Sequence, residues 1–395
     1  MKLLRGIGRL FTSSAMGTIQ NAAVAIDGSR IAWVGRAAEV PHDLAVDEEE
    51  DLGGGLITPG LIDAHTHALY AGDRMAEVAA RSAGAGYLEI ARMGGGIAAT
   101  VRATRGADPA ELEALTAARL RRWFEGGATT VEVKTGYHLD HDGEIEAVRT
   151  LARLRARPGL PRLRVTFLAA HSVPPEYEGR QAEYVDAVAG WSADAAAAGA
   201  DFCDVFCDEG YFSIDEGRRV IAAGVRAGLA PRIHADELAR TGGSQLAAEV
   251  GAASADHLLE ATDEDAKALA AAGVVATLAP GTAMSLKKTP PARRLLEAGS
   301  AIALGTDHNP GTSGLTSMSL VVALAVAVLG LSVDEALVAA TRGGAASLQV
   351  PDVGSIEPGK LADLVLWDAD HEGAFAWAFG LRPKTAWLGG QAITG

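Results

Sequence analysis

The sequence predicts an α/β fold: a (β/α)8 TIM-type barrel with a small β-sandwich domain built from both chain ends. Eight short apolar runs recur along the middle of the 395-residue chain, separated mostly by segments long enough to form helices. Such alternation of buried strands and helices is typical of parallel sheets. Eight units in a stretch near the usual length of about 250 residues favour a closed barrel. A doubly wound open sheet is the alternative.

The apolar runs define the expected barrel strands, which lie at residues 61–67, 129–134, 165–171, 202–208, 231–236, 253–258, 274–279 and 301–307. Between them, apolar spacing near 3.6 residues predicts helices over residues 180–198, 213–227, 263–272, 317–329 and 333–340. Ser332 is a suitable N-cap for the last of these helices. The longest connection, residues 68–128, holds a triple glycine at 94–96 and a further expected helix over 109–126.

The two chain ends carry strand-and-turn patterns instead. Residues 22–26 and 30–34 have strand character around a turn at Asp27-Gly28, and residues 361–367 and 385–388 resemble them near the other end. Neither end is long enough to bury a two-sheet core alone, so we expect the two to pair. The predicted domains are a composite β-sandwich of residues 1–58 and 354–395 and a barrel of residues 59–353.

Composition limits the possible partners. Hydrophobic residues make up 48% and charged residues 22%, which is ordinary for a globular protein, and the formal net charge is −15. This charge argues against nucleic acid and anionic membranes as main partners. The two cysteines, Cys203 and Cys207, lie in one apolar run and are expected to be unpaired core residues. With no apolar stretch of membrane-spanning length, we expect a cytoplasmic protein, and a homodimer on base rates.

Histidines mark the ends of several predicted strands. His65 and His67 end the first strand, and two residues of separation point both side chains to one face. His171, His234 and His257 end the third, fifth and sixth strands, so five of the ten histidines are strand-terminal. Strand carboxyl ends form the active-site face of a β/α barrel. We therefore expect these histidines on one face.

The same residues predict metal chemistry. Imidazoles together with Asp307, which ends the eighth strand, suit zinc or iron better than magnesium or calcium. Three histidines and one aspartate would leave a position for water, whose pKa such an ion lowers toward about 7. Asp307 could both bind the ion and accept the water's proton. His257 and Glu237 would then face the reacting carbonyl as electrophile and proton shuttle.

Several motifs resemble the amidohydrolase superfamily. They are the His-x-His segment at 59–67, the later single histidine, the aspartate after the eighth strand and the C-terminal segment 354–365. Segments 132–137, 170–177, 233–237, 254–258 and 306–311 are similar to the branch that opens a cyclic amide, 4-imidazolone-5-propanoate, to N-formimino-L-glutamate in histidine degradation. The resemblance covers nearly the whole chain and implies a metal-dependent hydrolase acting on a C–N bond of this small-molecule substrate.

The resemblance also implies individual roles. The metal ligands would be His65, His67, His234 and Asp307, and the catalytic residues Glu237, His257 and Asp307. Substrate-binding positions would be Arg74, Tyr137, His171, Asn309, Gly311 and Thr312. Arg74 is the natural bidentate partner of the propanoate carboxylate. His308 departs from the family pattern and would be either an aromatic surface or an added titrating group beside the metal.

Two alternatives stay open for the function and one for the metal. A nucleobase or guanidine-type deaminase uses a similar set of histidines and acids but has no need of Arg74. A barrel without activity that serves as a binding subunit would usually have lost ligands, and here none is lost. Some members of the superfamily hold two metal ions bridged by a carbamylated lysine on the fourth strand, but Lys134 ends the second strand. We therefore predict one divalent ion, Zn²⁺ or iron (Fe²⁺/Fe³⁺), with Lys134 as a structural group near it.

Overall fold

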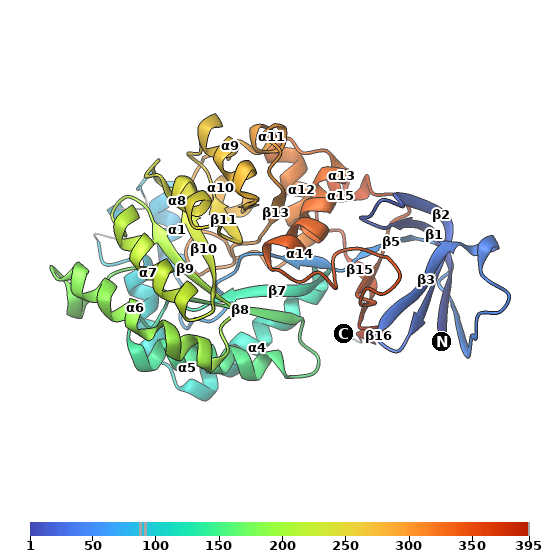
Figure 1. Ribbon diagram of the computed structural model, residues 1–395, viewed down its shortest axis with the longest axis horizontal. Coiled ribbons are helices and arrows are strands. Elements are labelled where there is room, and N and C mark those ends of the chain that lie inside the picture. Colours follow the sequence, from blue (N-terminus) through green and yellow to red (C-terminus); the bar gives the residue numbers. More distant parts are fainter. Residues whose placement is uncertain (87–88, 91–92, 394–395) are drawn as a thin grey trace.

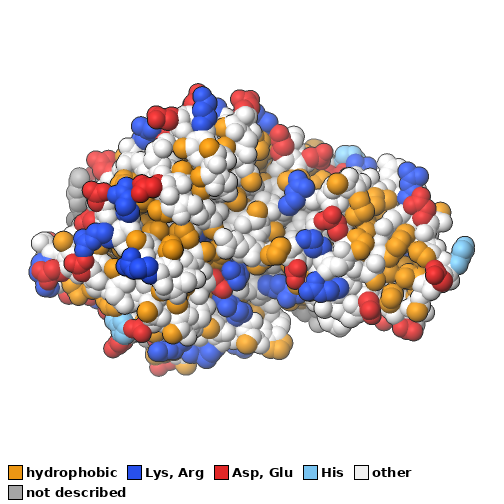
Figure 2. Space-filling model, viewed as in Figure 1, with side chains coloured by type: hydrophobic (Ala, Val, Ile, Leu, Met, Phe, Trp, Pro, Cys, Tyr) orange, Lys and Arg blue, Asp and Glu red, His pale blue; other side chains and the backbone are white. Residues whose placement is uncertain are grey.

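The protein is described by a computed structural model that covers residues 1–86, 89–90 and 93–393. Figure 1 shows a barrel wrapped by helices and, to its right, a smaller β-rich part where the first and last segments of the chain meet. Figure 2 shows basic and acidic side chains interspersed over the same face. Within the described residues, no helix has the length and apolar character needed to cross a bilayer.

Eight parallel strands form the barrel, in the order of the chain. Their bounds are β6 Leu61–Asp63, β7 Ala128–Lys134, β8 Arg162–Ala170, β9 Phe202–Cys207, β10 Ala230–Ala235, β11 Ser254–His257, β12 Val275–Leu278 and β13 Ile302–Leu304. The first and last strands meet where the amide of Ala64 donates to the carbonyl of Leu304, and Thr66 forms a parallel bridge with His308. The predicted barrel is therefore confirmed.

The first and last barrel strands are shortened most relative to the prediction, and beyond them isolated backbone hydrogen bonds, such as that from the amide of Asp307 to the carbonyl of His65, act together with side chains. β6 ends at Asp63, whose buried carboxylate accepts the amide and hydroxyl of Thr306 at 2.9 and 2.6 Å. The indole Nε1 of Trp123 donates to the same carboxylate at 2.6 Å. Burial outweighs these donors and raises the pKa of Asp63 to about 7. Asp63 thus joins the first and last strands just before the polar residues that follow them.

Helices cover the outside of the barrel (Figure 1). They are α1 Met75–Ser82, α3 Gly96–Arg105, α4 Pro109–Glu125, α5 His141–Arg155, α6 Gln181–Ala198, α7 Ile214–Arg226, α8 Gly243–Glu249, α9 Asp263–Ala272, α10 Pro280–Ser285, α11 Ala292–Glu297, α12 Met318–Leu329, α13 Val333–Val338, α14 Gly344–Ser347 and α15 Ala374–Trp377. Short turns of other helix types lie at Ala37–Glu39, Pro175–Tyr177 and Ala339–Gly343. Ser332 caps α13 as predicted, in a reciprocal box with Glu335.

The second sheet combines both chain ends, as predicted for the β-sandwich domain. Its strands run in the order β16-β15-β14-β5-β1-β2-β3, with β4 beside β1. Leu4 and Ile7 of the first strand pack in one buried cluster with Leu364 and Trp387 from near the end of the chain. The bounds are β1 Lys2–Phe11, β2 Thr18–Asp27, β3 Arg30–Arg36, β4 Glu48–Asp51, β5 Leu56–Pro59, β14 Leu364–Trp367, β15 Pro383–Leu388 and β16 Gln391–Ile393. The boundaries at 58/59 and 353/354 stay a prediction.

Both cysteines are buried, unpaired core residues, as expected. Helix α7 packs closely over them: a Cβ added at Gly224 would lie 2.2 Å from the sulfur of Cys203, and one at Gly217 would lie 2.3 Å from that of Cys207. Burial raises the pKa of the Cys203 thiol to about 12. The two thiols therefore act as small apolar groups that fix the distance between α7 and strand β9.

Candidate metal centre

One cavity gathers the residues that the sequence singled out. It lies at the carboxyl ends of the barrel strands, where the active-site face was expected. Its lining residues are His67, Arg74, Ile97, Tyr137, His171, Phe206, His234, Glu237, His257, Asp307, Asn309 and Thr312. Two predicted residues adjoin this set without belonging to it. His65 contacts His67, and Gly311 packs against Arg74.

The four predicted ligands lie close enough to share one ion. Nε2 of His67 is 3.3 Å from Nε2 of His65 and 3.4 Å from Nε2 of His234. Oδ1 of Asp307 is 3.5 Å from Nε2 of His65 and 3.4 Å from Nε2 of His67. Tetrahedral bonds of 2.0–2.1 Å around zinc would separate neighbouring ligand atoms by about 3.3 Å. These four distances therefore match those expected around a tetrahedral ion, and the donors form two overlapping groups, His65 with His67 and His234, and His65 with His257 and Asp307.

The protonation of the ligands fits the same site. Burial, with the positive charge of Lys134 next, lowers the pKa of His65 well below its usual range. Burial and the neighbouring His171 lower the pKa of His67 in the same way. Neutral imidazoles are the metal-binding form. His257 is a further potential donor, since it groups with His65 and Asp307 within 4.8 Å.

Asp307 is held in a strained position by its surroundings. Its backbone has φ +47°, in the left-handed region that side chains rarely adopt. The hydroxyl of Thr282, in α10, donates to Oδ2, which leaves Oδ1 facing the histidines. Burial raises the pKa of Asp307 to about 6 although Thr282 and His234 favour its charged form. A cation bound at this carboxylate would stabilise its charged form and so lower its pKa.

Glu237 and His257 face each other across the cavity. Oε2 of Glu237 lies 3.9 Å from Nε2 of His257. Burial raises the pKa of Glu237 well above its usual range, and the charges of Asp307 and Asp208 add to this. Burial and His234 lower the pKa of His257 to about 3. The pair thus combines a carboxyl group whose pKa is raised with an imidazole whose pKa is lowered, an arrangement suited to proton exchange.

Asp208 positions the loop that carries Glu237. Its carboxylate accepts the backbone amides of Glu237, Leu238 and Ala239 at 2.8, 2.8 and 3.0 Å. Three amides on one buried carboxylate fix the backbone on which the Glu237 side chain stands. Asp208 directly follows the fourth barrel strand, β9, but belongs to no motif that would mark it in the sequence.

Arg74 also lines the cavity and is buried, as a carboxylate-binding role requires. Its guanidinium makes a fork with Glu77, through Nε to Oε1 at 2.9 Å and Nη2 to Oε2 at 2.7 Å. The remaining nitrogen, Nη1, lies against Gly311, where an added Cβ would approach it to 2.4 Å. Gly311 therefore leaves the space that the guanidinium occupies. Glu77, which the sequence analysis missed, aligns Arg74.

Aromatic rings and one loop complete the cavity wall. The ring of His171 stacks on His67 with centroids 5.1 Å apart, and its Nδ1 lies 3.0 Å from the carbonyl of Gly136. Tyr137 packs beside both rings at 5.9 and 5.3 Å. Asn309 accepts the amides of Gly311 and Thr312 at 2.8 and 2.7 Å, so its side chain shapes the loop that presents Thr312 to the cavity.

His308 is directed away from the cavity. Its Nε2 lies 3.2 Å from the Tyr70 hydroxyl and its Nδ1 lies 3.0 Å from the carbonyl of Leu315. Its ring packs edge-on against Trp123 at 5.2 Å. Burial lowers the pKa of His308 to about 4, so the ring is neutral. Of the two alternatives from the sequence, the structure supports an aromatic packing role and not a titrating group beside the metal.

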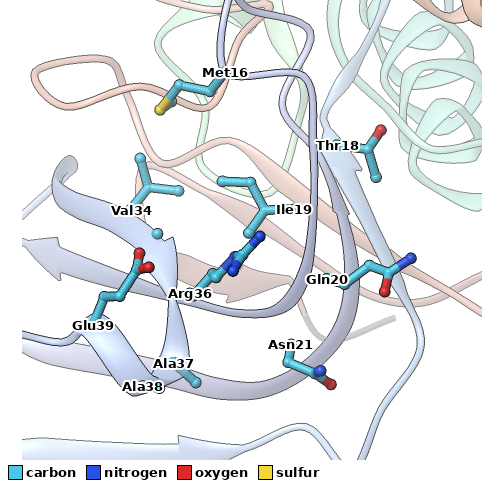
Figure 3. Close-up of a pocket in the computed structure, with 11 residues that line it drawn as sticks. Met16, Thr18, Ile19, Gln20, Asn21, Val34, Arg36, Ala37, Ala38 and Glu39 are labelled. Carbon is cyan, nitrogen blue, oxygen red and sulfur yellow. The ribbon is translucent and has the colours of Figure 1, made fainter.

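A wider surface hollow lies elsewhere, on the sandwich part, between residues 16–21 and 34–39. Figure 3 shows its lining, in which Arg36 and Glu39 are the charged side chains and no histidine or cysteine takes part. An open hollow without convergent catalytic groups is a weaker candidate than the smaller polar cavity.

Comparison with known proteins identifies the family of this chain. Residues 56–393 match the model of the amidohydrolase family. The chain is 45% identical to imidazolonepropionase of Anaeromyxobacter dehalogenans over 370 residues, which are 92% of this chain and 88% of that protein. It is 44% identical to imidazolonepropionase of Streptomyces avermitilis over 383 residues, which are 96% of this chain and 89% of that protein.

Solved structures share the fold at lower identity. The zinc complex of atrazine chlorohydrolase from Arthrobacter aurescens TC1 superposes with a TM-score of 0.71 at 20% identity, covering 100% of this chain and 95% of that one. Ochratoxinase of A. niger gives 0.74 at 19%, with the same coverage. With its His-rich cavity at tetrahedral spacing, the protein has a site for a divalent metal. The chain belongs to the amidohydrolase family.

Proposed function

We propose that this protein catalyses the imidazolonepropionase reaction, in which water opens the ring of 4-imidazolone-5-propanoate to give N-formimino-L-glutamate in histidine degradation. The protein is a hydrolase of C–N bonds, in line with relatives of 44–45% identity along most of the chain. The single observation that carries the choice of substrate is that buried Arg74 lines the same cavity as three of the four ligands. A ring with a carboxylate tail needs both groups.

His65, His67, His234 and Asp307 would hold one ion, Zn²⁺ or iron, since imidazole and carboxylate donors accept both. Such an ion, when bound, supplies a Lewis acid and makes hydroxide available near neutral pH. The neutral state of His65 and His67 leaves a nitrogen lone pair ready for it. Lys134 is engaged by three carboxylates at 2.9–3.3 Å and so supports a single ion rather than a lysine-bridged pair.

The substrate would be held at both ends. Arg74, aligned by Glu77, pairs with the propanoate, and Thr312 on the adjoining loop can donate to the same carboxylate. His171 and Tyr137 pack against the ring from the other side of the cavity. The reacting carbonyl is thereby directed towards His257 and the ligand cluster. Because the substrate is held in this orientation, less entropy is lost on reaching the transition state, and the activation free energy is lower.

Proton transfer then falls to three residues. Asp307 accepts a proton as water's oxygen bonds to the carbonyl carbon, and its pKa of about 6 suits a base near neutral pH. The His257 ring donates a hydrogen bond to the carbonyl oxygen as negative charge develops there. As the C–N bond breaks, Glu237, whose pKa is raised by burial, delivers a proton to the leaving nitrogen. One water is consumed: the proton that Asp307 accepted is returned to Glu237, which restores both residues, and the newly formed carboxylic acid releases the second proton of the water to solvent.

The experiment that tests the function is a turnover assay with measured metal content. Purified protein should hydrolyse imidazolonepropanoate and leave guanine and cytosine unchanged. Turnover of a nucleobase instead would favour the deaminase alternative. The homodimer, the cytoplasmic location and the absence of nucleic-acid and membrane partners stay predictions, which size-exclusion chromatography and cell fractionation would check.

A further inference from the structure

Five charged side chains are buried together next to the metal ligands: Glu132, Lys134, Asp204, Arg232 and Asp256. A buried ammonium group is costly unless it is paired and hydrogen-bonded. Nζ of Lys134 donates to Glu132 at 2.9 Å, to Asp204 at 2.9 Å and to Asp256 at 3.3 Å. All three donor positions of the ammonium are therefore used on carboxylates from β7, β9 and β11.

Two of these carboxylates also contact histidines of the proposed metal site. Oδ2 of Asp256 lies 2.7 Å from Nδ1 of His65, and Oδ2 of Asp204 lies 3.0 Å from Nδ1 of His234. The contact to His65 is a hydrogen bond, and a carboxylate hydrogen-bonded at Nδ1 keeps the proton on that nitrogen and leaves Nε2 as the metal-binding atom. The contact to His234 is a close approach without hydrogen-bond geometry. The Nε2 atoms of both histidines are the ones that face His67. The oxygens that Lys134 contacts are the same Oδ2 atoms that face the histidines.

The charges of the cluster match a divalent ion. Three carboxylates and two cations, Lys134 and Arg232, leave one net negative charge, and Asp307 makes it two. The two cations are placed differently. Arg232 donates to Asp256 but is otherwise held by the carbonyls of Ala64 and Ser347 at 2.8 and 2.9 Å. Within the described part of the chain, Lys134 is the cation in contact with both Asp204 and Asp256.

We infer that Lys134 is a positioning residue for the metal centre: by bridging Asp204 and Asp256 it sets the orientation of His65 and His234 and so determines how tightly the ion is held. Without the ammonium, the two carboxylates would repel each other, and their oxygens would turn away from the imidazoles. The ligands would then lose the tautomer and the spacing that suit the ion. The inference rests on the metal centre of the proposed function but not on its substrate.

The test is the zinc affinity of the Lys134→Met variant, measured by competition with a chelator, together with the visible spectrum of the Co²⁺-substituted protein. Loss of a partner behind the ligands typically lowers metal affinity by about 10- to 100-fold. We expect a decrease in this range and a changed Co²⁺ spectrum. Lys2→Met is the matched control, because Lys2 bridges Glu48 and Glu50 at 3.0 and 2.8 Å in the sandwich sheet, and its loss should change neither measurement.

A second variant covers the case in which Lys134→Met does not fold. Lys134→Met combined with Glu132→Gln restores the charge balance, and it is compared with Glu132→Gln alone through the zinc-induced rise in Tm. A smaller rise in the double variant supports the inference. Wild-type zinc affinity and an unchanged Co²⁺ spectrum in a folded Lys134 variant would overturn it. Wild-type protein that binds no zinc or iron would instead overturn the metal centre of the proposed function.

Discussion

Oε2 of Glu237 lies 3.9 Å from Nε2 of His257, across a cavity whose metal ligands are contributed by other residues. Glu237 and His257 are thus proposed proton-transfer groups outside the proposed ligand set, whereas Asp307 is proposed to serve in both. The same arrangement also places a carboxyl with a raised pKa beside an imidazole with a lowered one. Substitutions can therefore test the two roles separately.

Glu237→Gln should retain the metal and lose most of the activity. The amide is nearly isosteric but cannot deliver a proton, and general acid–base groups contribute about 10²- to 10⁴-fold. We expect kcat to fall by at least about 10²-fold, with metal content unchanged by elemental analysis. Glu209→Gln is the control. Glu209 is exposed and follows β9, the strand that pairs with β10, after which Glu237 lies. Near-normal turnover of metal-replete Glu237→Gln would exclude the role of this residue.

Thr282→Val should weaken metal binding. The Thr282 hydroxyl donates to Oδ2 of Asp307 and helps to keep this buried carboxylate charged. Removing the donor raises the pKa of Asp307 further, so the ligand is protonated over a wider range above pH 6. We expect about a tenfold loss of zinc affinity at pH 7, in line with other losses around metal ligands, and a larger loss at pH 6.

Two further variants make the Thr282 result specific. Thr282→Ser keeps the hydroxyl and should restore most of the affinity. Thr116→Val removes a buried hydroxyl that bonds the carbonyl of Leu112 within α4, away from the cavity, and should leave zinc binding as in the wild type. Equal zinc affinities for Thr282→Val and Thr116→Val at both pH values would contradict the prediction.

Arg74→Met should impair binding of the propanoate. A hydrogen bond to a charged group contributes about 1.5–3 kcal/mol, which corresponds to about 10- to 150-fold in KM. We expect KM for imidazolonepropanoate to rise in this range with a smaller change in kcat. Glu77→Gln, which loosens the alignment of Arg74, should have an intermediate effect. The binding of a ring analogue without the carboxylate is the control, and an equal loss for that analogue would show that Arg74 acts on the ring or the fold instead.

Asp265→Asn should reduce stability in a pH-dependent manner. Burial alone would raise the pKa of Asp265, but Arg240, Gln245 and the Thr262 cap outweigh it and lower the pKa from 3.8 to about 2. A lowered pKa contributes stability that is present above about pH 4 and is lost as the pH falls towards 2. We expect the variant to lose about 1 kcal/mol of unfolding free energy at pH 7, as for other lost caps.

Urea unfolding between pH 3 and 7 measures this difference. It should stay constant down to about pH 4 and shrink below it, because the wild-type carboxylate then begins to lose its advantage. Asp263→Asn, at an exposed position of the same helix, should change stability by much less. A difference that grows as the pH falls would have the wrong sign for the proposed contacts.

Much of the barrel could be predicted, because its signals are local. Apolar runs such as the one at β9 mark strands buried on both faces, and Ser332 with Glu335 marks a helix start within four residues. The lengths of β6 and β13 could not be predicted in this way. The chain beyond them is held by Asp63 and Thr306, which are 243 positions apart in the sequence.

The sequence by itself predicted the chemistry of this protein: which donors follow the strands, that imidazole and carboxylate donors suit zinc or iron, and, through the family resemblance, that Arg74 would pair with a carboxylate. Only the tertiary structure decided how these groups are tuned. Three sets of contacts join residues from different parts of the fold: the hydrogen bonds between Glu77 and Arg74, the three backbone amides that donate to Asp208, and the ion pairs around Lys134. The strength of such contacts depends on distance and burial in space, which the order of residues along the chain does not specify.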